Sequence, residues 1–131
     1  MSTYLLFIEL SKPVSIQVGK LGRFSFPAGQ YIYIGRAKKN LEARLARHQR
    51  KDKTCHWHID YILQYGNLKT TKTYDGDDEC GLARFLASQP GVTIPVRKLG
   101  STDCSCDSHF FKWDDRRNFF EIYTNISRHQ E

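Results

Sequence analysis

The chain has 131 residues and a formal net charge of +6, with 40% hydrophobic and 26% charged side chains. This length and balance predict one globular, soluble domain over residues 1–131 and argue against a disordered chain. The first apolar run, residues 4–8, is too short for a signal peptide or a membrane span, so we expect a cytoplasmic protein with no membrane partner.

Strands are predicted in the first third of the chain. Residues 4–10 are apolar on both faces, which favours a central strand. Residues 14–26 predict a hairpin, either inserted before the next strand or added to the edge of the sheet. In the following strand, residues 31–34, Tyr31 and Tyr33 should share one face of the sheet, and Gly35 is expected to end the strand.

A cationic helix is predicted next, over residues 41–51 with Asn40 as its cap. Arg44, His48 and Lys51 are spaced to share one face of it. Residues 36–53 contain eight Lys or Arg and two Asp or Glu, an excess of six that equals the net charge of the chain. This concentration favours an anion-binding surface over the alternative, a solvated surface helix. The cations expected to touch phosphates are Arg36, Lys38, Lys39, Arg47 and Lys51.

The second half of the chain alternates short helices and strands. Acidic residues before residue 79 are typical of a helix start, and Pro90-Gly91 of a helix end. The predicted elements are a helix over residues 56–64, an edge strand over 69–74, a helix over 78–88, strands over 93–98 and 110–113, and a final helix or strand around 119–123.

Tyr33-Ile34-Gly35 resembles one half of the signature motif of the GIY-YIG endonuclease superfamily. The other half of that motif ends in a tyrosine on the first strand, and Tyr4 occupies this place, after Ser2-Thr3 instead of Gly-Ile. The resemblance implies an α/β fold: one small domain over residues 1–131, a central mixed or antiparallel sheet, and about three flanking helices. The hairpin at residues 14–26 is an addition to that plan.

The resemblance continues downstream. Arg44 and His48 match the positions on the motif helix, and Glu79 fits the metal-binding glutamate of a later helix. Residues 56–61 and 101–110 are similar to the compact, stand-alone branch described as Uri-like endonucleases. The chain therefore resembles this branch from about residue 4 to residue 111.

The resemblance implies a divalent-metal-dependent endonuclease that hydrolyses phosphodiester bonds, with DNA favoured and RNA left open as the substrate, and with a role in repair or structure processing. Tyr4 and Tyr33 would face the site, and either could activate water. Arg44 offers a fork for a phosphate, and Glu79 suits Mg²⁺ or Mn²⁺. His48 is expected to titrate in a useful range and to share or assist the activation of water. The nearby cations could lower the pKa of a tyrosine below its normal value of about 10.

Three further groups leave alternatives open. His56 and Asp60 are four residues apart on a predicted helix and could form an imidazole–carboxylate pair, with His58 pointing elsewhere; surface or core histidines are the alternative. Cys104, Cys106 and His109 resemble zinc ligands without a fourth donor, which Cys80, Cys55 or a histidine could supply. Alternatively, Asp103 and His109 bind substrate in a polar loop, or the thiols are simply buried. We expect no disulfide framework.

Two other functions compete with the nuclease. One is a non-catalytic nucleic-acid-binding module that keeps the basic surface. The other is a zinc-stabilised interaction domain, although Mg²⁺ or Mn²⁺ is the favoured cofactor. The sequence names no protein partner.

Overall fold

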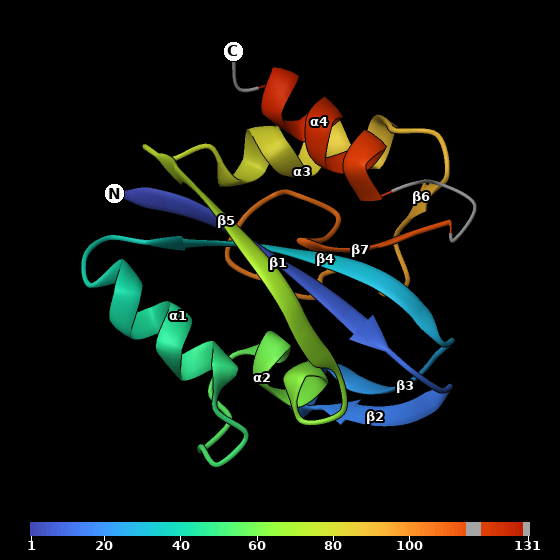
Figure 1. Cartoon of the computed structure of the whole chain (residues 1–131). Helices are drawn as coiled ribbons and strands as arrows, with labels where there is room; N and C mark the ends of the chain where they lie inside the picture. Colours follow the sequence, from blue (N-terminus) through green and yellow to red (C-terminus); the bar gives the residue numbers. More distant parts are fainter. Residues whose placement is uncertain (115–118, 130–131) are drawn as a thin grey trace.

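The computed structural model describes residues 1–114 and 119–129. A five-stranded antiparallel sheet forms the middle layer of the molecule (Figure 1), with strand order β5-β1-β4-β7-β6. Its strands are β1 (Ser2–Leu10), β4 (Gly29–Ala37), β5 (Asn67–Asp75), β6 (Val92–Thr93) and β7 (Phe110–Trp113). As predicted, β1 lies inside the sheet and β5 lies at its edge.

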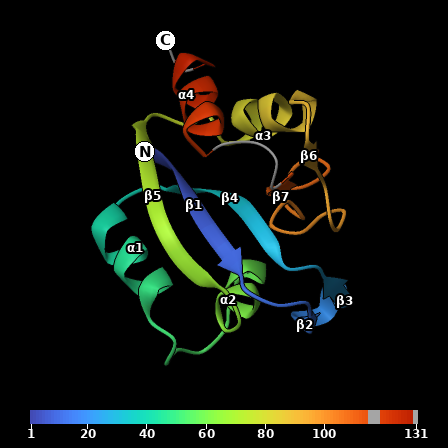
Figure 2. The same ribbon diagram turned by 45° about the vertical axis from the view of Figure 1, so that its right-hand side comes forward.

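Helices cover both faces of this sheet. Figures 1 and 2 show α3 and α4 side by side on one face, and α1 and α2 on the other. The helices are α1 (Leu41–Gln49), α2 (His58–Leu63), α3 (Glu79–Ser88) and α4 (Phe119–His129). The predicted α/β class, with an antiparallel sheet and flanking helices, is confirmed. Among the helices of the described residues, none combines the length and the hydropathy that a membrane crossing requires.

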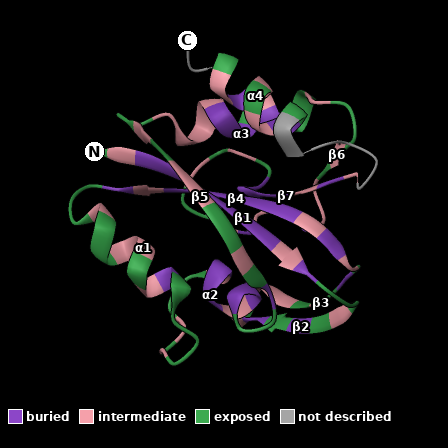
Figure 3. Ribbon diagram, in the orientation of Figure 1, coloured by how far each residue is buried: buried purple, intermediate pink, exposed green. Residues whose placement is uncertain are grey.

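The alternation of the two inner strands divides the core into two clusters. Tyr31 and Tyr33 of β4 pack on the side of α1 and α2, whereas Ile32 and Ile34 pack on the side of α3 and α4. Figure 3 shows β1 and β4 buried along most of their length, while much of β5 is exposed. The predicted orientation of these tyrosines is therefore confirmed.

The hairpin forms a sheet of its own. Within the part of the chain that the structure describes, β2 (Val14–Val18) and β3 (Gly22–Phe26) pair only with each other, and a short 3-10 turn, η1 (Gly19–Leu21), joins them. Of the two predictions, the insertion between the motif strands is confirmed and the added edge strand is wrong. The hairpin packs against α2, where Tyr61 lies next to Gly19.

Several element boundaries differ from prediction. The helix expected to reach Lys51 ends at Gln49, because Arg50 has extended backbone (φ −81°, ψ 135°). Asn40 occupies the cap position, but its φ of 59° is left-handed and its side chain makes no capping bond. Gly35 does not end its strand, since β4 continues to Ala37. The strand predicted over residues 93–98 is only Val92–Thr93, and the undecided final element is the helix α4.

Candidate active site

A pocket of about 520 Å³ opens where β1 begins and β4 ends. Most of the residues that the sequence singled out meet there, although they come from five different elements and three loops. Those that line the pocket are Tyr4, Tyr33, Arg36, Lys38, Lys39, Arg44, His56, His58, Glu79 and Asp103. Arg47, His48, Lys51, Cys104, Cys106 and His109 do not line it.

The two motif tyrosines are neighbours at the base of the pocket. Their ring centroids are 6.5 Å apart, and both rings are largely buried. Gly35 lies opposite Tyr4 in the register of the two strands, and a Cβ at Gly35 would come within 2.5 Å of the Tyr4 hydroxyl. Glycine is therefore needed at this position to make room for a ring, and not to turn the chain.

Tyr4 connects the pocket to a histidine behind it. Its hydroxyl lies 2.8 Å from Nε2 of His48, and His48 is only 2% exposed. The other ring nitrogen of His48, Nδ1, has no hydrogen-bond partner among the described residues. His48 does not line the pocket, so its described contact with the site runs through Tyr4.

Burial controls the protonation of the two motif tyrosines and of His48. Burial raises the pKa of Tyr4 to about 12, although Arg44 opposes the shift, and it raises the pKa of Tyr33 well above its ordinary value. The prediction that nearby cations lower a tyrosine pKa is therefore wrong, because desolvation outweighs their attraction. Burial, assisted by Lys53, also lowers the pKa of His48 to about 4. His48 is thus neutral at pH 7, and the prediction that it titrates near neutrality is wrong as well.

Arg44 is held in place at the wall of the pocket. One guanidinium nitrogen donates to the carbonyl of Arg36 at 2.5 Å, and the guanidinium carbon lies 4.6 Å from the centre of the Trp57 ring. A fixed guanidinium keeps its remaining N–H groups directed, which suits recognition of a phosphate. Trp57 is 37% exposed and lines the same pocket.

The neighbouring Arg47 has a structural partner. It forms a two-pronged ion pair with the fully buried Asp60, with both N···O distances at 2.9 Å. Asp60 also accepts bonds from the backbone N–H groups of His56 and Trp57, at the start of α2. Asp60 therefore pairs with Arg47 and not with the His56 imidazole. Of the two alternatives for His56, the structure shows the surface histidine, because His56 is exposed.

Lys51 is also bound within the protein. Its ammonium group donates to the carbonyls of Leu63 and Gly66, which follow α2. The structure therefore joins Lys51 and Arg47 to α2 and its flanks, whereas the pocket itself receives Arg36, Lys38 and Lys39. Lys38 and Lys39 are exposed, so their charges are available to a ligand.

Glu79 reaches the pocket from the first turn of α3. Thr3, which sequence reasoning did not single out, fixes this turn to β1: its hydroxyl donates to the carbonyl of Gly76 and accepts the N–H of Asp78. The Glu79 side chain is 13% exposed, and its Oε1 lies 3.9 Å from Nε of Arg36. Burial raises the pKa of Glu79 to about 7, against the opposing effect of Arg36.

The donor set around Glu79 fits a hard divalent cation. One carboxylate, Glu79, is directed into a polar pocket that a second carboxylate, Asp103, also lines. Mg²⁺ and Mn²⁺ are commonly held by one or two carboxylates together with water and substrate oxygens. His58 and Gly100 also line this pocket, and Nδ1 of His58 accepts the backbone N–H of Gly100 at 2.9 Å.

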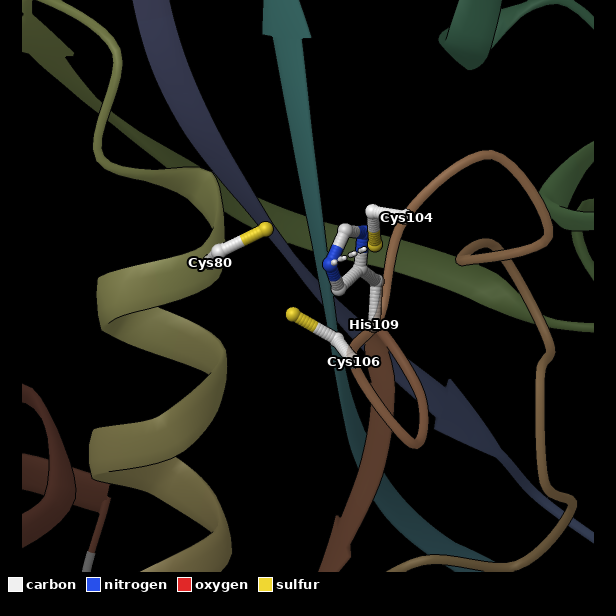
Figure 4. Close-up of side chains that lie close together, drawn as sticks. All are labelled: Cys80, Cys104, Cys106 and His109. Carbon is white, nitrogen blue, oxygen red and sulfur yellow. Dashed lines mark hydrogen bonds between the residues drawn. The ribbon is translucent and has the colours of Figure 1, made fainter.

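A second group of donors lies beside the pocket. Cys104 and Cys106 come from the loop of residues 99–109, His109 ends that loop, and Cys80 follows Glu79 on α3. One ligand atom from each of these four residues lies within 4.8 Å of all the others, and Figure 4 shows the three sulfurs around the imidazole. This thiol cluster could hold a metal ion. Of the fourth donors considered, Cys80 is the one that the structure supplies.

Sequence reasoning missed some of the pocket. Gly100 and Thr102 line it. Thr102 lies within the string of residues 101–110 and Gly100 directly before it, which was the only sequence signal for either residue. Cys55 lies outside the thiol cluster, and all four cysteines are free, as expected.

Together the fold and site define a small antiparallel α/β domain with a cationic, carboxylate-bearing pocket beside a thiol cluster. The chain belongs to the family described as Domain of unknown function DUF123, whose model matches residues 3–131. No curated protein and no solved structure matches the sequence.

Proposed function

We propose that this domain is a metal-dependent endonuclease of the GIY-YIG type that hydrolyses phosphodiester bonds, with DNA as the favoured substrate. One observation carries the proposal: Tyr4, Tyr33, Arg44 and Glu79, from four separate elements, converge on one pocket. These are the residue types that such hydrolysis needs, namely a group to handle the proton of water, a phosphate clamp and a metal anchor.

Tyr4 is the group that handles the attacking water. Tyr4 lines the pocket, and its hydroxyl contacts Nε2 of the neutral His48 at 2.8 Å. A proton leaving water can pass to the tyrosine oxygen while the tyrosine proton passes to His48, so that no tyrosinate has to accumulate. Tyr33, beside it, restricts the position of the water.

Arg44 and Glu79 handle the negative charge. Arg44 provides a preorganised guanidinium for a non-bridging phosphate oxygen, since its orientation is already fixed by the Arg36 carbonyl and Trp57. Glu79 would hold Mg²⁺ or Mn²⁺, with Asp103 close by in the same pocket. A divalent ion bound there supplies Lewis-acid stabilisation of charge on phosphate and leaving oxygens.

The surroundings of the pocket suit a nucleic acid. Lys38 and Lys39 are exposed at the pocket and can contact phosphates on either side of the cut bond. The exposed ring of Trp57 offers a surface on which an unpaired base can stack. Phosphate contacts alone do not separate DNA from RNA, so both belong in the test.

The test is a cleavage assay on labelled single-stranded, duplex, flapped and damaged DNA, and on RNA, with Mg²⁺ or Mn²⁺. Wild type, Arg44→Ala and Glu79→Gln are compared. Arg23→Ala is the matched control for Arg44→Ala, because Arg23 is exposed on the hairpin and its replacement removes the same charge. We expect cleavage by wild type and Arg23→Ala only. Binding without cleavage by folded wild type would instead favour the non-catalytic module.

A further inference from the structure

We propose that Cys80, Cys104, Cys106 and His109 bind one structural Zn²⁺, and that this ion fixes the wall of the pocket that carries Glu79. The four ligand atoms lie within 4.8 Å of one another. A tetrahedral ion with bonds of about 2.3 Å to sulfur separates its sulfurs by roughly 3.8 Å. The donors therefore need to approach by no more than about 1 Å to complete a four-coordinate shell.

The loop that carries two of the thiols is closed by hydrogen bonds of its own. The ammonium of Lys98 donates to the carbonyls of Cys104 and Cys106 at 3.0 and 2.9 Å. The Ser101 hydroxyl donates to the Cys106 carbonyl, and the His109 N–H donates to the Leu99 carbonyl. These bonds hold the main chain of the loop, and the Cys104 thiol makes one further weak bond, to the Ser101 carbonyl at 3.6 Å. Figure 4 shows the three sulfurs turned toward one another and toward the imidazole.

The chemistry of the donors selects the ion. Thiolates and imidazole are ligands for Zn²⁺, whereas Mg²⁺ and Mn²⁺ prefer the oxygen donors of the adjacent pocket. None of the three cysteines lines that pocket, and four protein donors leave no position for a substrate. Such a closed Cys₃His shell is typical of structural zinc. A disulfide would use only two of the three thiols.

His109 joins the two sites. Its Nε2 lies 3.6 Å from the sulfur of Cys104, and its Nδ1 lies 3.6 Å from Oε1 of Glu79. Imidazoles that bind zinc through one nitrogen usually direct the other toward a carboxylate or carbonyl that orients the ring. Cys80 is also the residue next to Glu79, and the loop of residues 99–109 gives Asp103 to the pocket. This second part of the inference, the support of Glu79, rests on the proposed function.

Metal content tests the zinc site without reference to cleavage. Wild type and the single variants Cys80→Ser, Cys104→Ser and Cys106→Ser are purified under reducing conditions and analysed for Zn²⁺ and iron. Cys55→Ser is the matched control, because Cys55 is a free cysteine outside the cluster. We expect one Zn²⁺ per chain in wild type and Cys55→Ser, and loss from the other three. Stoichiometric iron in place of zinc, or equal loss from Cys55→Ser, would overturn the proposal.

A second measurement covers variants that fail to fold. Co²⁺ added to metal-depleted wild type should give the intense near-ultraviolet bands of thiolate-to-cobalt charge transfer, and Zn²⁺ should abolish them. Absence of these bands from folded protein that also lacks zinc contradicts the site.

Variants of Glu79 separate this inference from the proposed function. Glu79→Gln should keep its zinc and lose cleavage, since Glu79 is not a ligand of the thiol cluster. Glu79→Ala, which removes the partner of His109, should weaken Zn²⁺ binding about tenfold in competition with a chromophoric chelator. Zinc without any cleavage by wild type would refute the nuclease alone. Unchanged zinc affinity in Glu79→Ala would refute the link through His109.

Discussion

The face of the sheet that α1 and α2 cover buries different kinds of side chain from the face that α3 and α4 cover. The first, here called the tyrosine face, carries Tyr4, Tyr31 and Tyr33. The second, here called the apolar face, carries residues such as Phe7 and Ile32 from the same two strands. The alternating side chains of β1 and β4 therefore serve two purposes. On the apolar face they pack against α3 and α4, and on the tyrosine face they also place hydroxyl groups in the core.

The hydroxyls of the tyrosine face show where function is to be sought. A buried hydroxyl needs a partner, and Tyr31 has an ordinary one, the carbonyl of Pro27 at 2.6 Å. Tyr4 is different, because its partner is a buried, neutral histidine and Tyr4 itself lines the pocket. The comparison of the two faces predicts that substitutions on the apolar face lower the free energy of unfolding, whereas those around Tyr4 mainly lower the rate of cleavage.

Phe7→Ala is the largest change expected on the apolar face. The ring is 1% exposed and lies against Trp113 and Tyr123, with centroid distances of 6.1 and 6.0 Å. Its removal leaves a cavity, and we expect a loss of about 4 kcal/mol in the free energy of unfolding, measured by urea denaturation. The comparison variant Tyr31→Phe, which removes one hydroxyl, should lose only about 1 kcal/mol. Equal losses in both variants would contradict the proposed division between the faces.

Tyr4→Phe should have the opposite pattern. Without the hydroxyl, water in the pocket has no path to His48, and we expect single-turnover cleavage to fall about 10²- to 10³-fold. The cost in stability should be smaller, about 1–3 kcal/mol, because Nε2 of His48 is left without its partner. Tyr31→Phe is again the control and should cleave normally. A Tyr4→Phe variant that cleaves at the wild-type rate would exclude Tyr4 from proton transfer.

Much of this contrast could be predicted from sequence, because alternation along a strand is local. The faces of Tyr31 and Tyr33 followed from a period of two, and the resemblance to a known motif brought Arg44 and Glu79 into consideration. The partner of Asp60 could not be predicted in this way. A helical spacing of four shows which residues share a side, but Arg47 comes from another helix.

Burial was the other quantity that sequence did not provide. The shifts in the pKa values of Tyr4 and His48 are dominated by desolvation, which depends on the packing of distant segments around them. Charge counting along residues 36–53 considered only the cations and so gave the wrong sign for the tyrosine. Likewise, Lys51 does not share the helix face of Arg44 and His48, because the chain leaves helical geometry at Arg50.

The buried histidine should make stability depend on pH. The pKa of His48 is about 4 in the folded protein, below the ordinary 6.5 of an unfolded chain. Between these values the unfolded state binds the proton and the folded state does not, so stability falls as pH falls from 6.5 to 4. The full difference is about 3 kcal/mol.

The variant His48→Gln separates the contribution of His48 to the pH dependence of stability from that of other groups that titrate in acid. Denaturation of wild type and His48→Gln is followed at several pH values, since both proteins keep the thiol cluster and Glu79. The difference in unfolding free energy between them should change by about 3 kcal/mol over this range. The charged groups that act on His48 are Arg44, Arg47, Lys53 and Asp60, and all are present in both proteins. Parallel pH profiles would show that His48 is not held neutral by its burial.

The smallest expected effect concerns the cations around the pocket of the tyrosine face. Lys38 and Lys39 are exposed there, whereas the ammonium of Lys51 is bound to the carbonyls of Leu63 and Gly66. Each phosphate contact contributes about one to the slope of log affinity against log salt concentration. Without divalent metal, Lys38→Ala and Lys39→Ala should each lower that slope for labelled duplex DNA by about one, and Lys51→Ala should leave it unchanged. Because all three variants remove the same charge, an equal effect of Lys51→Ala would mean that net charge, and not the position of a cation at the pocket, determines binding.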